Sequence, residues 1–108
     1  MRYRVGVIGD LETVIGFGLA GVGDLHLSRS RDEDLAALRR MAEGGRVAVI
    51  LVTAPVAEEL HDEIERLRKR GLPMIVTIPD SRGVGPKVDE VERIIRRTLG
   101  TKVVLGGV

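Results

Sequence analysis

Residues 5–21 read VGVIGDLETVIGFGLAG, and this stretch decides the fold. The apolar run from Val5 to Ile8 is typical of a buried strand, and the Gly9-Asp10 pair ends it sharply. The following segment opens with acids, as helices prefer, and the carboxylate of Asp10 can cap its N-terminus. A strand, a tight turn and a helix in this order predict the first βα unit of an open α/β sheet.

The composition is typical of one soluble globular domain. Of the 108 residues, 44% are hydrophobic and 31% are charged, which is enough to build a core. The absence of cysteine excludes disulfides and thiolate metal sites. No apolar run approaches the roughly 20 residues of a membrane-spanning helix, so we expect a cytoplasmic protein without direct membrane insertion. A net charge of +1 and only two aromatic residues argue against nucleic-acid binding.

Three further strands are expected along the chain. Continuous apolar runs predict strands at 47–52 and 74–78, and residues 24–28 alternate as in an edge strand with one wet face. Runs without alternation are typical of parallel strands that helices cover on both faces. Right-handed crossovers then favour a small flavodoxin-like, or receiver-like, α/β domain, with a parallel four-stranded sheet in the order 2-1-3-4, flanked by helices.

Two helices are expected between these strands. Ser30 and Glu33 have the spacing of a capping box, which opens a helix that ends near residue 43. Pro55 stands in the first turn of the next helix, where its missing N–H does no harm, and Gly71 closes that helix.

The C-terminal quarter has a different pattern. We divide the chain into a sheet domain at 1–79, a flexible linker at 80–86, a hinged amphipathic helix at 87–100 and a tail at 101–108. The apolar stripe of this helix contains Val88, Val91, Ile94, Ile95 and Leu99. Three cations face elsewhere: Arg93, Arg96 and Arg97. Because an apolar stripe must be buried, the helix either packs back on its own sheet or is held out for a partner.

A candidate crevice lies where the first and third strands of the sheet end. Asp10 and Thr53 should face each other there, with Thr13, Asp80 and Ser81 nearby. A receiver domain needs a phosphorylatable aspartate at the end of the third strand, and this chain has Thr53 there. We therefore expect Asp10 and Thr53 to cap helices. A receiver-like or small-ligand-binding regulatory domain remains the alternative function.

Other motifs do not assemble a reaction centre. Residues 16–21 spell G-x-G-x-x-G, but they follow the strand too late to place a pyrophosphate at the helix N-terminus. The sequence has no Gly-Lys pair and therefore no Walker A loop. His61 and Glu65 share a helix face, but two ligands do not make a closed metal site. We expect no catalytic residue, cofactor or metal.

The opening stretch is similar to the N-terminal signature of the F subunit of the archaeal A-type and vacuolar-type ATP synthases. The matching residues are Gly9, Asp10, Thr13, Val14, Gly16, Phe17, Leu19, Ala20 and Gly21. The similarity continues through 49–53, 56–59 and 73–79 to the final helix and its closing Gly100. It implies that the residues which define the motif are structural: Gly9, Asp10, Thr13, Gly16, Phe17, Gly21 and Thr53.

This resemblance implies a non-catalytic component of the central stalk of a rotary motor. Such a component binds the D subunit, which forms the coiled-coil shaft, and couples ATP turnover in the catalytic head to proton or sodium transport. The complex would hold it at the cytoplasmic face of the membrane. We expect the stripe of helix 87–100 to contact the shaft or the A and B subunits of the head, and its three arginines to pair with acids there.

Overall fold

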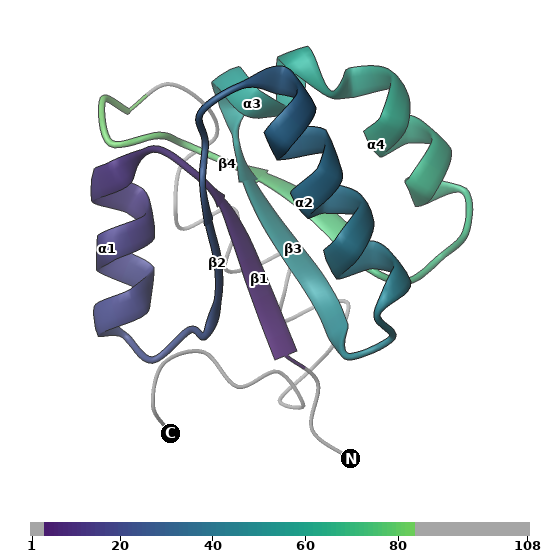
Figure 1. Cartoon of the computed structure of the whole chain (residues 1–108), viewed down its shortest axis with the longest axis horizontal. Coiled ribbons are helices and arrows are strands. Elements are labelled where there is room, and N and C mark those ends of the chain that lie inside the picture. Colours follow the sequence, from purple (N-terminus) through teal and green to yellow (C-terminus); the bar gives the residue numbers. More distant parts are fainter. Residues whose placement is uncertain (1–3, 84–108) are drawn as a thin grey trace.

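A computed structural model describes residues 4–83, and its elements follow the predicted order (Figure 1). The elements are β1 (Arg4–Gly9), α1 (Leu11–Leu19), β2 (Asp24–Leu27), α2 (Arg31–Glu43), β3 (Val47–Thr53), α3 (Ala54–Glu59), α4 (His61–Arg68) and β4 (Met74–Ile78). The predicted helix at 87–100, the tail at 101–108 and the second half of the linker at 80–86 lie outside the described residues.

The four strands form a parallel sheet in the order β2-β1-β3-β4, as predicted. In the register of the central pair, Val7 lies opposite Leu51 and Ile8 opposite Val52. These four side chains are buried, alternately on the two faces of the sheet. The apolar runs without alternation therefore reflect strands that are covered on both sides.

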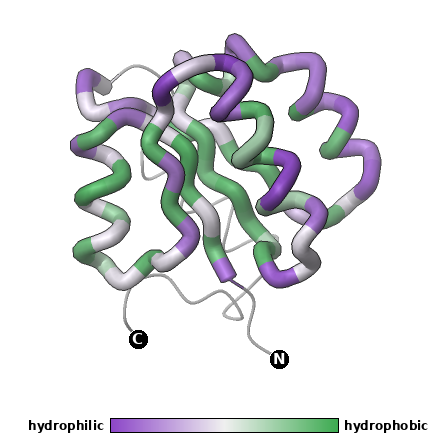
Figure 2. Tube along the Cα trace, viewed as in Figure 1, coloured by the Kyte–Doolittle hydropathy of each residue, from purple (hydrophilic) through white to green (hydrophobic). Residues whose placement is uncertain are grey.

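The helices lie on the two faces of the sheet (Figure 1). The core on one face is formed with α2, α3 and α4 and contains Ile8, Leu38, Ile50, Val52, Val56, Leu60, Ile64 and Leu67, among others. The opposite face contains Val5, Val7, Val49, Leu51, Val76 and Ile78, with Phe17 of α1 packed against them. Figure 2 shows hydrophobic residues along the central strands and hydrophilic residues over much of α2 and α4.

The chain from residue 54 to residue 70 does not form the one helix that the sequence predicts. It is divided at Leu60, whose φ of −102° and ψ of 19° leave the helical range, although its side chain is buried in the core. No loop separates β3 from α3, so the exit of the strand sets the direction of the first turns. The change at Leu60 then allows α4 to run back along the sheet (Figure 1).

Candidate functional site

The carboxyl ends of the strands enclose a crevice of about 420 Å³. Its polar lining comes from the ends of three strands and from the loop after β4: Asp10, Glu12, Ser28, Thr53, Asp80, Ser81 and Arg82. The structure thus brings Asp10, Thr53, Asp80 and Ser81 together, although they are far apart in the sequence. This is the position at which open α/β sheets bind ligands, because the strand order reverses between β1 and β3.

The carboxylate of Asp10 caps the N-terminus of α1. Its Oδ1 atom accepts a hydrogen bond of 2.7 Å from the Thr13 hydroxyl, and its Oδ2 atom accepts one of 3.4 Å from the Thr13 amide. Burial raises the pKa of Asp10, but hydrogen bonds from the Ser81 and Thr13 hydroxyls and from the Thr13 amide outweigh it and lower the pKa to about 2. The carboxylate is therefore charged at neutral pH and joins the start of α1 to the loop after β4.

Asp80 lines the crevice from the loop after β4, and its carboxylate is hydrogen-bonded to Arg82. Its side chain is only 4% exposed, and its Oδ2 atom accepts hydrogen bonds from Nη2 and Nε of Arg82 at 3.0 and 3.2 Å. The Arg82 amide donates to Oδ1 at 3.0 Å, which closes a tight turn at the start of the linker. Two of the three carboxylates of the crevice, those of Asp10 and Asp80, therefore already have partners, and the third, Glu12, lies in the first turn of α1.

Thr53 does not cap α3 with its side chain, contrary to the prediction. It occupies the N-cap position, but its hydroxyl makes no capping hydrogen bond. Pro55 removes one of the two amides that such a cap could bind, and the other, that of Val56, is not capped by the hydroxyl. The side chain instead packs against Gly9, where an added Cβ would lie 2.5 Å from the Cγ2 methyl of Thr53. Gly9 is thus required by the close approach of β1 and β3.

Three other predicted motif residues, Gly16, Phe17 and Gly21, do not line the crevice. Gly21 has a φ of 103°, which an L side chain rarely adopts, and it follows the end of α1. Phe17 packs against the core. Gly16 is exposed, and nothing lies within 4 Å of an added Cβ there, so contacts within the described chain do not explain it.

The outer surface of α1 is apolar, which the sequence reasoning missed. Leu11, Ile15 and Leu19 are 55%, 50% and 85% exposed, and their spacing of four places them on one side of the helix. We call these three residues the α1 stripe. None of the residues of α1 is fully buried, and Figure 2 shows hydrophobic colour over most of this helix. The available signal was that apolar residues of α1 occupy more than one face, which a helix with one packed side does not need.

A buried acid, Asp34, was also missed. It is 2% exposed, and it accepts hydrogen bonds from the Ser28 hydroxyl at 2.6 Å and the Arg29 amide at 3.2 Å. Nε2 of His26 lies 3.0 Å from its Oδ1 atom. The carboxylate lies between the hydroxyl and the imidazole, so the ring cannot accept a proton from Ser28 as a catalytic base would. The cluster attaches β2 to α2.

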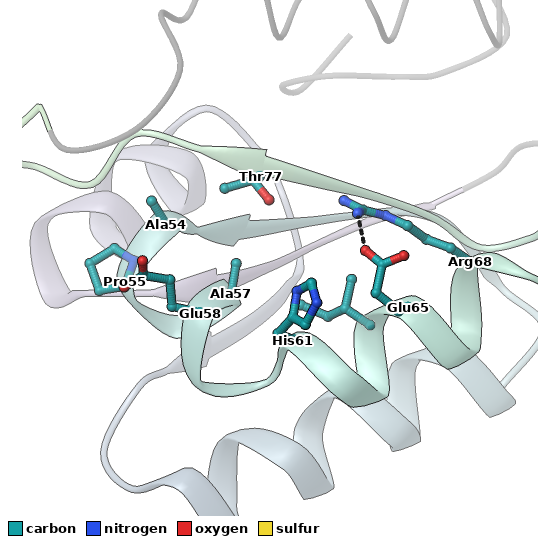
Figure 3. A pocket seen from close by; sticks show the side chains of 9 residues that line it. Ala54, Pro55, Ala57, Glu58, His61, Glu65, Arg68 and Thr77 are labelled. Atoms are coloured by element: carbon teal, nitrogen blue, oxygen red, sulfur yellow. Dashed lines mark hydrogen bonds and ion pairs between the residues drawn. The ribbon is translucent and has the colours of Figure 1, made fainter.

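A second cavity, of about 320 Å³, lies between α3, α4 and the outer edge of β4 (Figure 3). The predicted pair of His61 and Glu65 lies here. Glu65 accepts a hydrogen bond of 2.9 Å from Arg68, which also donates to the carbonyl of Ile75 at 3.1 Å. Arg68 thus covers part of the open strand edge. Among residues 4–83, no group of three or more histidine, cysteine, aspartate or glutamate side chains is arranged to hold a metal.

These features define a class: a small doubly wound α/β domain with an exposed apolar helix face. The family described as ATP synthase (F/14-kDa) subunit matches residues 5–95. The chain therefore belongs to the family of ATP synthase F subunits, and it is one component of a complex of several subunits.

Relatives of this family match nearly the whole chain. The F subunit of the A-type ATP synthase of Methanocaldococcus jannaschii is 35% identical over 100 residues, which cover 93% of this chain and 98% of the relative. The protein of the same name from Methanothermobacter thermautotrophicus is 33% identical over 106 residues, covering 96% and 99%. No helix within residues 4–83 is long and apolar enough to cross a membrane.

Proposed function

We propose that this chain is a non-catalytic component of the central stalk of an A-type or vacuolar-type ATP synthase. In this role it binds the D subunit, the coiled-coil shaft, and takes part in coupling ATP turnover in the catalytic head to proton or sodium transport. Membership of the family of F subunits supports the proposal. The crevice agrees with it, because Asp10 is used to cap α1 and Asp80 to hold the loop after β4.

The α1 stripe is the observation that carries the binding role. Four residues of helix rise about 6 Å, so Leu11, Ile15 and Leu19 form a ridge about 12 Å long. Such an i, i+4 ridge fits between the side chains of a second helix. Gly16 and Ala20 lie beside the ridge and are not buried, which leaves room for a close helix–helix approach. A helix of a coiled-coil shaft is a partner of this shape.

A second contact is proposed for the helix predicted at 87–100. Its stripe, Val88, Val91, Ile94, Ile95 and Leu99, would bind the shaft or the A and B subunits of the catalytic head. Arg93, Arg96 and Arg97 would pair with acidic residues of those partners. In this arrangement the chain is peripheral at the cytoplasmic face of the membrane.

Co-elution with the cognate shaft protein, the D subunit, on size exclusion tests the proposal. The wild-type chain should form a stable one-to-one complex with it. The triple variant Leu11→Ser, Ile15→Ser, Leu19→Ser should weaken this complex at least tenfold, while the isolated chain keeps its fold, because none of the three side chains is fully buried. Leu72→Ser is the matched control, since Leu72 is also 55% exposed but lies just before β4. If the wild-type chain does not bind the shaft, the proposal is wrong.

A separate variant addresses the C-terminal contact. Ile94→Asp with Ile95→Asp should reduce the affinity of the chain for the assembled complex or change its ATPase activity. If both the affinity and the activity stay at the wild-type values, helix 87–100 is not a contact surface.

A further inference from the structure

A third cavity, of about 290 Å³, lies at the opposite end of the sheet from the crevice. It is formed where β1, β2 and β3 begin and where α2 ends. Its lining is Arg4, Gly23, Asp24, Leu25, Arg40, Met41, Gly44, Arg46 and Val47. We call it the arginine pocket, because three arginines from three different segments, Arg4, Arg40 and Arg46, are among the residues that line it.

The charges of the arginine pocket are not balanced within the described chain. Among residues 4–83, Asp24 is the one carboxylate against Arg4, Arg40 and Arg46. Arg40 lies in the last turn of α2, where a cation is favourable for the helix dipole, but Arg46 is not in a helix. Neither Arg40 nor Arg46 forms an ion pair with another residue of this part of the chain. Two positive charges of the pocket are therefore without a counter-ion among the described residues.

Arg4 is held in place with donors still available. Its backbone N–H donates to the carbonyl of Arg46 at 3.0 Å, which fixes these two residues side by side. Its Nε atom lies 2.9 Å from Oδ2 of Asp24, yet that oxygen accepts no well-aligned hydrogen bond from the described residues. The contact is thus a pairing of charges that orients the Arg4 guanidinium and leaves its N–H groups for another acceptor.

Glycines shape the arginine pocket at Gly23 and at the end of α2. A Cβ at Gly23 would lie 3.3 Å from Nη2 of Arg4, so a side chain there would press on the guanidinium. Gly44 ends α2, and the following Gly45 turns the chain with a φ of 73° toward Arg46. The concave shape distinguishes this region from an ordinary surface that carries scattered arginines.

We propose that the arginine pocket binds the phosphate group of a small soluble molecule. Planar guanidinium groups match the oxygens of a phosphate, and several of them balance its double negative charge. The volume is at the lower end of the range for ligand sites, which suits inorganic phosphate or a small phosphate ester. This site is independent of the stalk role proposed above, because it uses none of the residues of the α1 stripe.

The test is a titration of the full-length chain with inorganic phosphate and pyrophosphate, followed by the amide signals in NMR spectra. Ionic strength is held constant with chloride, and no other phosphate is present. Saturable shifts should concentrate at Gly23, Asp24, Gly44 and Arg46. The variants Arg40→Gln and Arg46→Gln should each weaken binding about tenfold, the effect expected for loss of one charged hydrogen-bonding partner.

Arg70→Gln is the matched control, because it removes the same charge from an exposed residue outside the arginine pocket. It should change the affinity less than twofold. The spectra of all three variants also report whether the fold is kept. Equal weakening by Arg46→Gln and Arg70→Gln, or shifts spread over the whole basic surface, would overturn the site. Binding of succinate as tight as that of phosphate would overturn the assignment to phosphate and point to carboxylates of an acidic partner chain.

Discussion

Replacing Gly9 by alanine tests how closely β1 and β3 pack at their carboxyl ends. The new Cβ would lie 2.5 Å from the Cγ2 methyl of Thr53 and 3.3 Å from its hydroxyl. Two carbon atoms in contact are normally about 3.5–4.0 Å apart. Thr53 is 2% exposed and cannot turn its methyl toward solvent. One of the two central strands must therefore shift.

The close contact between residues 9 and 53 should lower the stability of a Gly9 variant and couple the two sites. We expect Gly9→Ala to lower the free energy of unfolding by about 2 kcal/mol, as overpacking of a tight core does. Thr53→Ser removes the methyl and costs about 1 kcal/mol by itself through lost apolar burial. In the Thr53→Ser background, the atoms nearest to the new Cβ are the hydroxyl oxygen and the Cβ of residue 53, at 3.3 and 3.5 Å. Gly9→Ala should therefore cost little there. The expected coupling between the two sites is about 1.5 kcal/mol.

Urea unfolding of the wild type, the two single variants and the double variant, followed by circular dichroism, measures this coupling. Gly16→Ala serves as a control, because an added Cβ at Gly16 has no neighbour within 4 Å. It should stabilise the chain by up to about 1 kcal/mol through its better helix propensity. The reasoning is refuted if Gly9→Ala is as harmless as Gly16→Ala, or if it costs the same with Thr53 intact and in the Thr53→Ser background.

Two further predictions concern the carboxylates of Asp10, which is partly buried, and Asp34, which is buried. The pKa of Asp10 falls from 3.8 to about 2 on folding, so its charge stabilises the fold above about pH 4, and this contribution is lost as the pH falls toward 2. Asp10→Asn should therefore cost about 1–2 kcal/mol at pH 7, with the difference from wild type shrinking below about pH 4 and vanishing below pH 2. A difference that does not depend on pH would contradict this. Asp34→Ala should cost about 3 kcal/mol in urea unfolding, because the Ser28 hydroxyl and the Arg29 amide lose a buried acceptor. Asp34→Asn keeps an acceptor and should cost about half as much, whereas equal costs would argue against the hydrogen-bond explanation.

The sheet could be predicted because its signals are local. The apolar runs of β1 and β3 lack alternation since both faces are covered, and the strand order follows from the handedness of the crossovers. The start of α2 could also be predicted, from the capping spacing of Ser30 and Glu33. The Glu33 amide does donate a hydrogen bond to the Ser30 hydroxyl at 3.2 Å. The strands and this cap are decided by residues that are neighbours in the sequence, whereas the strand order comes from the general rule on crossovers.

The break at Leu60 could not be predicted from the hydrophobic pattern. Val56, Leu60 and Ile64 are all buried at a spacing of four, which is the pattern of one uninterrupted helix. The amide of Leu60 still bonds to the carbonyl of Val56, and the carbonyl of Leu60 to the amide of Ile64. The pattern reports which residues face the core, while the bend depends on how the chain leaves β3.

The sites were harder to predict because they combine distant segments. Asp34 is one of three acids in the first turn of α2, and only the placement of β2 brings His26 and Ser28 onto it. The α1 stripe is visible as apolar residues, but the sequence does not say which side of α1 meets the sheet. The roles of helix 87–100 stay predictions.

The turn from Asp80 to Gly83 has a mechanical consequence. It is closed by the Arg82 amide on the Asp80 carboxylate and by the Gly83 amide on the Asp80 carbonyl at 3.0 Å. A pull on the chain from residue 84 onward would therefore reach β4 through this turn. Because β4 runs parallel to β3, a load along the strand would shear the hydrogen bonds between them together rather than open them one by one. A load of this kind would be shared among the hydrogen bonds of the β3–β4 pair.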